Sequence, residues 1–124
     1  WKANSHCNLI HGYALGFEIT FESVELNEQN WVIDFGDLGI LKKYLKETFD
    51  HTTVISHDDP HYETFVELDK KQMIDLRVMD NVGCEAFAEE VFKFCKSTLE
   101  DDRVFIRTVR VFEHGSNSAV FGNF

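Results

Sequence analysis

Apolar and polar residues alternate along residues 13–23, the most regular stretch of the chain. A period of two is typical of a β-strand that buries one face. The buried face is expected to carry Leu15, Phe17, Ile19 and Phe21, and the exposed face Gly16, Glu18, Thr20 and Glu22. The pattern therefore predicts a half-buried strand over residues 13–23.

A turn and the start of a helix are predicted next. The polar residues 27–30 indicate a turn, and the apolar residues 31–33 indicate a return to strand. Asp34 suits a helix N-cap, and Asp37 follows at the position of a capping-box acid. The helix beyond them should bury one face, formed by Leu38, Leu41, Leu45 and Phe49.

The middle of the chain carries weaker signals. Residues 56–62 contain the only proline and predict a loop. Residues 63–79 predict a short helix followed by a strand near residues 74–78. A second long helix is expected to begin near Cys84, with a buried stripe formed by Phe87, Val91, Phe94 and Thr98.

Two strands are predicted near the C-terminus. Residues 103–113 are rich in Val and Phe, residues 115–118 suit a turn, and residues 119–121 suit a short last strand. Adjacent strands separated by helices favour the α+β class. We therefore expect an antiparallel sheet covered on one face by two helices.

The length of 124 residues indicates one domain over residues 1–124. The chain contains twelve Phe, a number that suggests that other subunits cover part of the apolar surface. Because the chain begins at Trp1 and not at Met, we expect a further N-terminal segment outside this sequence.

Charge and cysteine content exclude several classes of partner. Twelve basic and 22 acidic residues give a formal charge of −10, which repels phosphate backbones and argues against a nucleic-acid partner. No apolar run approaches the roughly 20 residues of a membrane helix, and no signal peptide is visible. Three cysteines cannot pair completely, so we expect a reduced, cytoplasmic protein.

Two pairs of reactive side chains stand out. Cys7 and His11 lie four residues apart ahead of the first strand, where an imidazole can stabilise a thiolate; their chance co-occurrence in a loop is the alternative. Asp50 and His51 follow the first helix, and a carboxylate beside an imidazole can fix its tautomer. For this pair the alternative is that His51 caps the helix C-terminus.

A third candidate is Glu113, at the end of a strand rich in Val and Phe. A carboxylate there could accept two parallel hydrogen bonds from an amidine-like group, or it could simply face water. Cys84 and Glu85 are interpreted as structural residues of a helix start, and the alternative is that Cys84 lines a pocket. One loop contains residue types that can bind metals, namely His57, Asp58, Asp59 and His61. We interpret this loop as a solvated acidic surface and not as a metal site.

These pieces, taken in order, resemble the family of 6-pyruvoyl-tetrahydropterin synthase and 6-carboxytetrahydropterin synthase. The family's C-x-x-x-H-G-H is similar to CNLIHGY, which begins at Cys7. Four further segments match in the same order: WVIDFGDL (31–38), FDH (49–51), NVGCEAFA (81–88) and VRVFEHGSNSAVF (109–121). The resemblance therefore covers nearly the whole chain.

The resemblance implies a fold and an assembly. The fold would be the tunnelling fold, a four-stranded antiparallel sheet with two helices on one face. Protomers would join their sheets into a β-barrel, as a homo-oligomer that is a hexamer in the family. Active sites would lie at subunit boundaries.

The resemblance also implies a role for each candidate. Cys7 would be the catalytic thiolate that moves a proton on the substrate side chain, with Asp50 and His51 as acid–base partners. Glu113 would bind the aminopyrimidine N–H groups of a pterin. His11 would be one of three zinc-binding histidines.

Two features depart from the family pattern. The second histidine of H-G-H is Tyr13 here, and the family's first zinc ligand lies in an upstream strand outside this sequence. Only His11 remains by alignment, with His6 as a neighbour, so an incomplete zinc site is predicted. The segment 56–80 is also longer than in compact family members, and we expect a different pocket rim.

The implied function is that of a 6-carboxytetrahydropterin synthase-like lyase. Its substrate would be 7,8-dihydroneopterin triphosphate, on the route to 7-deazaguanine (queuosine-type) nucleosides. One alternative is 6-pyruvoyl-tetrahydropterin synthase activity. Another is a divergent paralogue that binds a pterin or purine without turnover, and a purely structural oligomer is the third.

Overall fold

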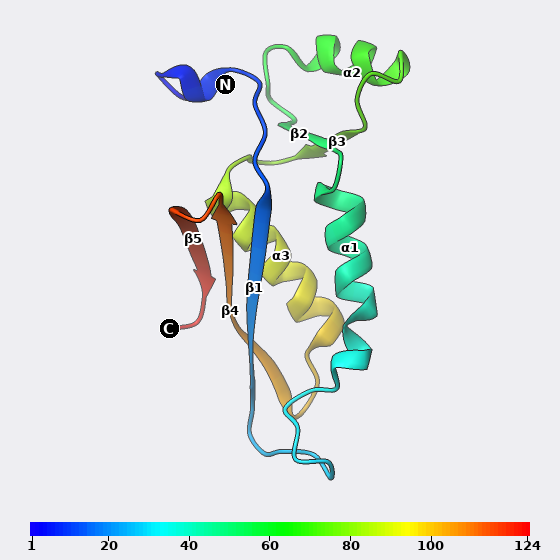
Figure 1. Ribbon diagram of the computed structural model, residues 1–124, viewed down its shortest axis with the longest axis vertical. Helices are drawn as coiled ribbons and strands as arrows, with labels where there is room; N and C mark the ends of the chain where they lie inside the picture. Colours follow the sequence, from blue (N-terminus) through cyan, green and yellow to red (C-terminus); the bar gives the residue numbers. More distant parts are fainter.

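The computed structural model describes all 124 residues as an α+β fold with three α-helices (Figure 1). Two short 3₁₀ turns, η1 (His6–Asn8) and η2 (Phe35–Leu38), precede β1 and α1. The regular elements, in chain order, are β1 (Leu15–Ser23), α1 (Gly39–Phe49), β2 (Thr53–Ser56), α2 (Tyr62–Lys70), β3 (Leu76–Met79), α3 (Cys84–Leu99), β4 (Val104–Glu113) and β5 (Asn117–Gly122).

The main sheet is antiparallel and has three strands in the order β1-β4-β5. At one end of the sheet Glu113 pairs with Leu15 on one side and with Asn117 on the other. The register of β1 shifts after Thr20, which marks a bulge or irregularity. The sheet is thus one strand smaller than the four-stranded sheet that the resemblance implied.

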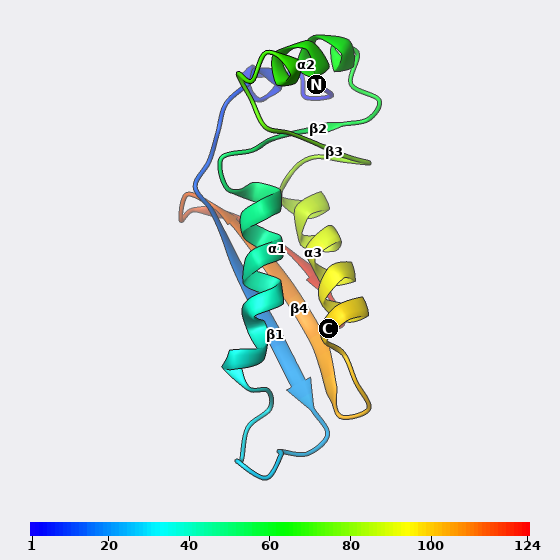
Figure 2. The same ribbon diagram turned by 90° about the vertical axis from the view of Figure 1, so that its right-hand side faces the viewer.

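Helices α1 and α3 cover one face of this sheet, as expected (Figure 2). Residues of α3 and β4 form the fully buried centre of the core, which includes Ala88, Val91, Cys95, Ile106, Val109 and Val111. Helix α1 joins it through Phe49, whose ring lies 4.9 Å from Phe17 and 5.1 Å from Phe87. Burying one such side chain contributes about 1.5–3 kcal/mol, so this layer holds much of the stability.

The buried stripe of α3 is wider than predicted. Phe87 and Val91 are buried, but Phe94 is only half-buried against Tyr44, and Thr98 is exposed. The remaining buried positions of the helix are Ala88, Phe92 and Cys95. The prediction missed them because α3 contacts both the sheet and α1, which buries a wider sector than a single stripe.

The predicted strand at residues 31–33 is wrong. The guanidinium group of Arg103 donates to the carbonyl oxygens of Trp31 and Val32, at 3.4 and 2.9 Å, so a side chain satisfies this backbone. The N-cap role of Asp34 is confirmed, because its Oδ1 accepts from the Gly36 N–H at 2.8 Å. It caps η2, and α1 begins only at Gly39.

A second, two-stranded sheet was not predicted. Strands β2 and β3 pair in parallel, connected by α2, at the end of the molecule where α1 ends (Figure 1). The short helix and the strand expected in residues 63–79 are present, but β2 adds a strand just ahead of the predicted loop. Strand β2 has only four residues, TVIS, which is too short to show an alternating pattern. None of the helices is both long and apolar enough to cross a bilayer.

Candidate functional site

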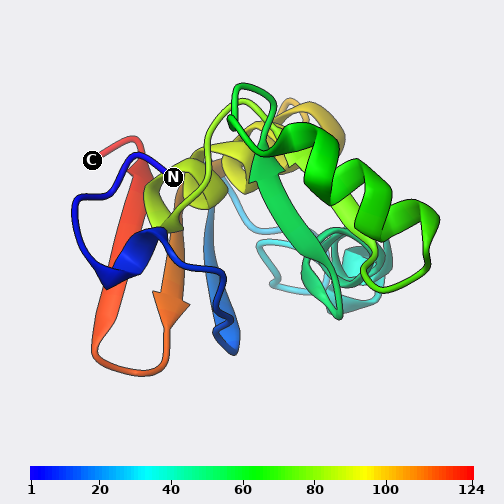
Figure 3. The same cartoon turned by 90° about the horizontal axis from the view of Figure 1, so that it is seen from above.

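The predicted site residues sit at one end of the fold. Strand β4 ends there at Glu113, α1 ends there before Asp50, and α3 begins there at Cys84 (Figure 1). The segment that carries Cys7 lies above the same end of the sheet, over β4 and β5 (Figures 1 and 3). Antiparallel strands and helices of alternating direction bring these distant segments together.

Glu113 contacts Cys84, a residue that we had interpreted as structural. The thiol Sγ donates to Glu113 Oε2 at 3.7 Å, and both side chains are half-buried. Burial, followed by the charge and hydrogen bond of Glu113, raises the pKa of Cys84 to about 11. Cys84 is therefore a neutral hydrogen-bond donor at neutral pH, and it leaves Glu113 as the only charged member of the pair.

Tyr13 links the N-terminal segment to Glu113. Its hydroxyl lies 3.1 Å from His11 Nε2, and its ring packs 5.2 Å from that of His114, the residue after Glu113. Burial, then electrostatic interactions with Glu113, Cys7 and Cys84, raise the pKa of Tyr13. Tyr13 thus connects the segment that carries Cys7 to the end of β4 that carries Glu113.

Cys7 itself is exposed, in the turn η1. Ser5 caps this turn, because its Oγ accepts from the Cys7 N–H at 3.3 Å. The hydrogen bonds of the turn are all local, so nothing within it fixes the thiol relative to Glu113.

Asp50 and His51 form the carboxylate–imidazole pair that the sequence predicted. His51 Nδ1 lies 2.7 Å from Asp50 Oδ1, and a positive φ of 57° at His51 turns the imidazole back toward Asp50. The helix C-cap is Asp50, and His51 follows it directly in the left-handed conformation that often ends a helix, so the C-terminal alternative for His51 stays open. The His51 side chain is 94% exposed, and no hydrogen bond or ion pair joins this pair to Cys7 or Glu113 in the chain.

The side chains present do not fit a three-ligand zinc site. Both ring nitrogens of His11 are engaged, Nε2 by the Tyr13 hydroxyl and Nδ1 by the Leu9 carbonyl oxygen. No three His, Cys, Asp or Glu side chains in the chain are grouped so that they could hold a metal ion. In the loop after β2, which we interpret as a solvated acidic surface, Asp59 accepts from the His61 N–H at 2.8 Å.

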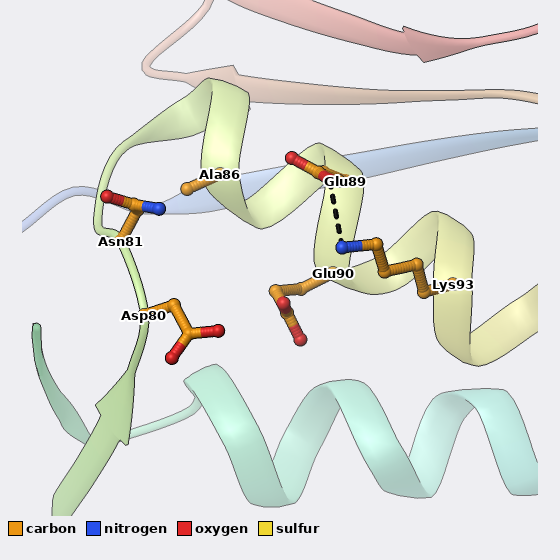
Figure 4. A pocket seen from close by; sticks show the side chains of 6 residues that line it. All are labelled: Asp80, Asn81, Ala86, Glu89, Glu90 and Lys93. Carbon is orange, nitrogen blue, oxygen red and sulfur yellow. Dashed lines mark ion pairs between the residues drawn. The ribbon is translucent and has the colours of Figure 1, made fainter. Parts of the chain in front are cut away.

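A polar hollow near the start of α3 contains none of the predicted residues (Figure 4). Asp80 and Glu90 point into the space between α3 and α1, while Glu89 pairs with Lys93 at 2.8 Å. The hollow lacks a thiol or imidazole, and we assign no chemistry to it.

A family model described as 6-pyruvoyl tetrahydropterin synthase matches residues 1–123. The chain belongs to this family. The resemblance drawn from the sequence motifs is therefore confirmed.

Curated relatives are consistent with this family. The chain is 30% identical over 103 residues to 6-carboxy-5,6,7,8-tetrahydropterin synthase of Aquifex aeolicus, covering 81% of this chain and 63% of that protein. It is 26% identical over 112 residues to the synthase of the same name from Rickettsia bellii, covering 86% and 78%. The match to the Bacillus subtilis synthase, at 26% identity, covers 61% of this chain and 50% of that protein. The chain thus spans less than two thirds of the Aquifex and Bacillus proteins.

A solved structure has the same fold. The crystal structure of an uncharacterized protein from Wolinella succinogenes superposes with a TM-score of 0.82 at 22% identity, covering 95% of this chain and 81% of that one. This similarity confirms the α+β architecture.

Sequence reasoning missed two contributors to this end of the molecule. His114 was not selected, although it directly follows Glu113 and packs on Tyr13. Cys84 was set aside because a helix start explained it. The signal that could have found both is their adjacency to residues already chosen, His114 in sequence and Cys84 in the antiparallel packing of α3 on β4.

Proposed function

We propose that this chain is a lyase of the 6-carboxytetrahydropterin synthase type, acting on 7,8-dihydroneopterin triphosphate. The observation that carries the proposal is the half-buried Glu113 carboxylate, set at a strand end beside a neutral thiol and below the segment that carries Cys7. The names of the curated relatives support the carboxy product over the pyruvoyl one.

Glu113 would bind the pterin ring. A carboxylate can accept two parallel N–H bonds from an aminopyrimidine, which gives both affinity and orientation. Cys84 donates only a weak hydrogen bond to Glu113, so a substrate amine can displace it. The ring would thus be fixed by the sheet end, with its side chain directed toward Cys7.

Cys7 would move a proton on the substrate side chain, with Asp50 and His51 as acid–base partners. Loss of triphosphate and cleavage of the side chain would follow. Because Asp50 and His51 have no contact with Cys7 in one chain, we propose that the pair acts on the site of a second copy, in a homo-oligomer such as the family's hexamer.

Turnover tests this proposal directly. The protein is incubated with 7,8-dihydroneopterin triphosphate, and mass spectrometry should detect the carboxy product. Cys7→Ala and His51→Asn should each abolish it. Mixed together in one assembly, the two inactive variants should recover about a quarter of wild-type activity, because some sites then combine an intact Cys7 with an intact His51.

Other outcomes are informative. A pyruvoyl product would support the alternative branch of the family. No recovery in the mixture would place both halves of the site in one chain. No turnover by the wild-type protein would refute the lyase assignment.

A second candidate function is pterin binding without turnover. The observation that favours it is the bond between Tyr13 and His11, since Tyr13 stands where the family has a histidine. Calorimetry with neopterin distinguishes the two, because tight binding without any product supports a binding protein.

A further inference from the structure

The only polar residue among the thirteen buried residues of the chain is Ser56, at the end of β2. Ser56 is 6% exposed, and its Oγ accepts from the indole Nε1–H of Trp1 at 3.0 Å. Burying a hydroxyl is unfavourable unless it is hydrogen-bonded. The bond joins residues that are 55 positions apart in the sequence.

Two more side chains complete this contact. Lys2 Nζ lies 3.7 Å from Asp58 Oδ2. A hydrogen bond from Ser56, with smaller contributions from the Lys2 charge and the Trp1 indole, lowers the pKa of Asp58 against the opposing effect of burial. Trp1, Lys2, Ser56 and Asp58 together are called the arm anchor below.

The arm anchor holds one end of the N-terminal arm, residues 1–14. The other end is held by the Tyr13 ring, which packs against His114, and by its continuation into β1. Cys7 lies between the two attachments and makes only local bonds. Seen from above, the arm passes over the ends of β4 and β5 (Figure 3).

We propose that the arm anchor positions Cys7 for the reaction, so that Ser56 and Trp1 are positioning residues of the site. The inference rests on the proposed function, because it assigns a task to the Cys7 thiol. A segment attached at both ends samples far fewer conformations than a free tail. A reactive group held in one place acts at a much higher effective concentration on a bound substrate.

The anchor also gives the β2–α2–β3 unit a role. Ser56 is the last residue of β2 and the buried contact of this unit with the arm. An alanine at this position would suit the burial equally well, so the hydroxyl is there for its hydrogen bonds.

The test compares Ser56→Ala with Ser97→Ala, an exposed serine on α3 whose hydroxyl bonds only neighbours on its own helix. Amide exchange is measured by NMR at Cys7, Asn8 and Leu9, whose N–H groups bond within the arm. Loss of the anchor should speed this exchange about tenfold. The indole N–H signal of Trp1 should shift, while that of Trp31 serves as the internal reference.

Kinetics provide the second measurement. Because Glu113 is untouched, Ser56→Ala should lower kcat about tenfold and leave KM within about twofold. Trp1→Phe keeps an aromatic ring but removes the indole donor, and it should act in the same direction. Ser97→Ala should change neither exchange nor kcat.

Each alternative result has a clear meaning. Unchanged exchange and an unchanged Trp1 signal in Ser56→Ala would overturn the anchor, whatever the activity. A loosened arm with unchanged kcat would overturn its positioning role. If the wild-type protein never turns over, the proposed function fails, and the exchange comparison still decides whether the anchor orders the arm around Cys7.

Discussion

The two halves of the candidate site are built in different ways. Glu113 lies on β4, the middle strand of the main sheet, and pairs with Leu15 and Asn117 on either side. Cys7 lies on an exposed arm, in a turn that bonds only to itself. One half is fixed by the core, and the other depends on attachments at the two ends of the arm.

This difference matches the roles proposed for the two residues, which are ligand binding for Glu113 and proton transfer for Cys7. A carboxylate on a paired strand keeps its direction without any ligand, which suits binding of a flat heterocycle. A thiol on an arm can approach a substrate after binding, but its position must be held by specific contacts. Substitutions in the two halves should therefore change different measured quantities.

The largest expected effect is on ligand affinity. In Glu113→Gln the carboxylate, whose two oxygens can accept two N–H groups, is replaced by a neutral amide with one such oxygen. The substitution should weaken neopterin binding by about 2–4 kcal/mol, or about 30- to 1000-fold in Kd. Isothermal calorimetry measures this change. Cys7→Ala, in the other half, should leave Kd within about twofold because the ring does not depend on it.

A matched control for this substitution is Glu22→Gln. Glu22 lies on β1, exposed and 3.3 Å from Arg107, far along the strand from the site end. The Kd of the Glu22→Gln variant for neopterin should equal that of the wild type. If Glu113→Gln also binds like the wild type, Glu113 is merely a strand-end charge.

The sequence predicted the elements of the main sheet well. The regular alternation in residues 13–23 and the Val- and Phe-rich residues 103–113 correspond to β1 and β4, because each strand faces the core on one side. The error at residues 31–33 has a physical cause, since Arg103 from a distant segment binds their carbonyl groups. Such a long-range hydrogen bond cannot be predicted from the pattern of apolar and polar residues in the segment itself.

The candidate site was predictable only in part. Sequence motifs selected Cys7, Glu113 and the Asp50–His51 pair, and the structure shows that pair in hydrogen-bond contact. Cys84 and Glu113 are 29 positions apart in the sequence, and no local sequence pattern predicts their contact. The same holds for the bond between the Trp1 indole and its serine partner on β2.

Substitutions in the core and in the arm should also differ, by a smaller amount, in their effect on the free energy of unfolding. Val91 is fully buried in α3 against β4, so Val91→Ala should lower the free energy of unfolding by about 2 kcal/mol through lost contacts and a cavity. Leu9 lies on the arm and is 65% exposed, so Leu9→Ala should cost less than about 0.5 kcal/mol. Urea denaturation measures both. Equal costs would mean that the arm belongs to the cooperative core.

The smallest predicted effect is the loss of stability at alkaline pH. Burial raises the pKa of Cys84 and of Cys95 from 9.0 to about 11, with Glu113 adding to the shift at Cys84. The folded chain therefore keeps both thiol protons in a range where the unfolded chain loses them. Their contribution to stability is complete below the ordinary thiol pKa, and it declines as the pH rises toward about 11.

The measurement is the urea midpoint at pH 8 and at pH 10.5, under reducing conditions, for the wild type and for the double variant Cys84→Ala/Cys95→Ala. The variant starts lower at pH 8, because Cys95 is fully buried and its removal leaves a small cavity. Between the two pH values, however, the wild type should lose more stability than the variant, since only the wild type carries the two buried thiols. Burial also raises the pKa of Tyr44 in both proteins, and the variant loses only the smaller contribution that Cys95 makes to that shift. Parallel losses would show that neither thiol is shielded from water in the folded chain.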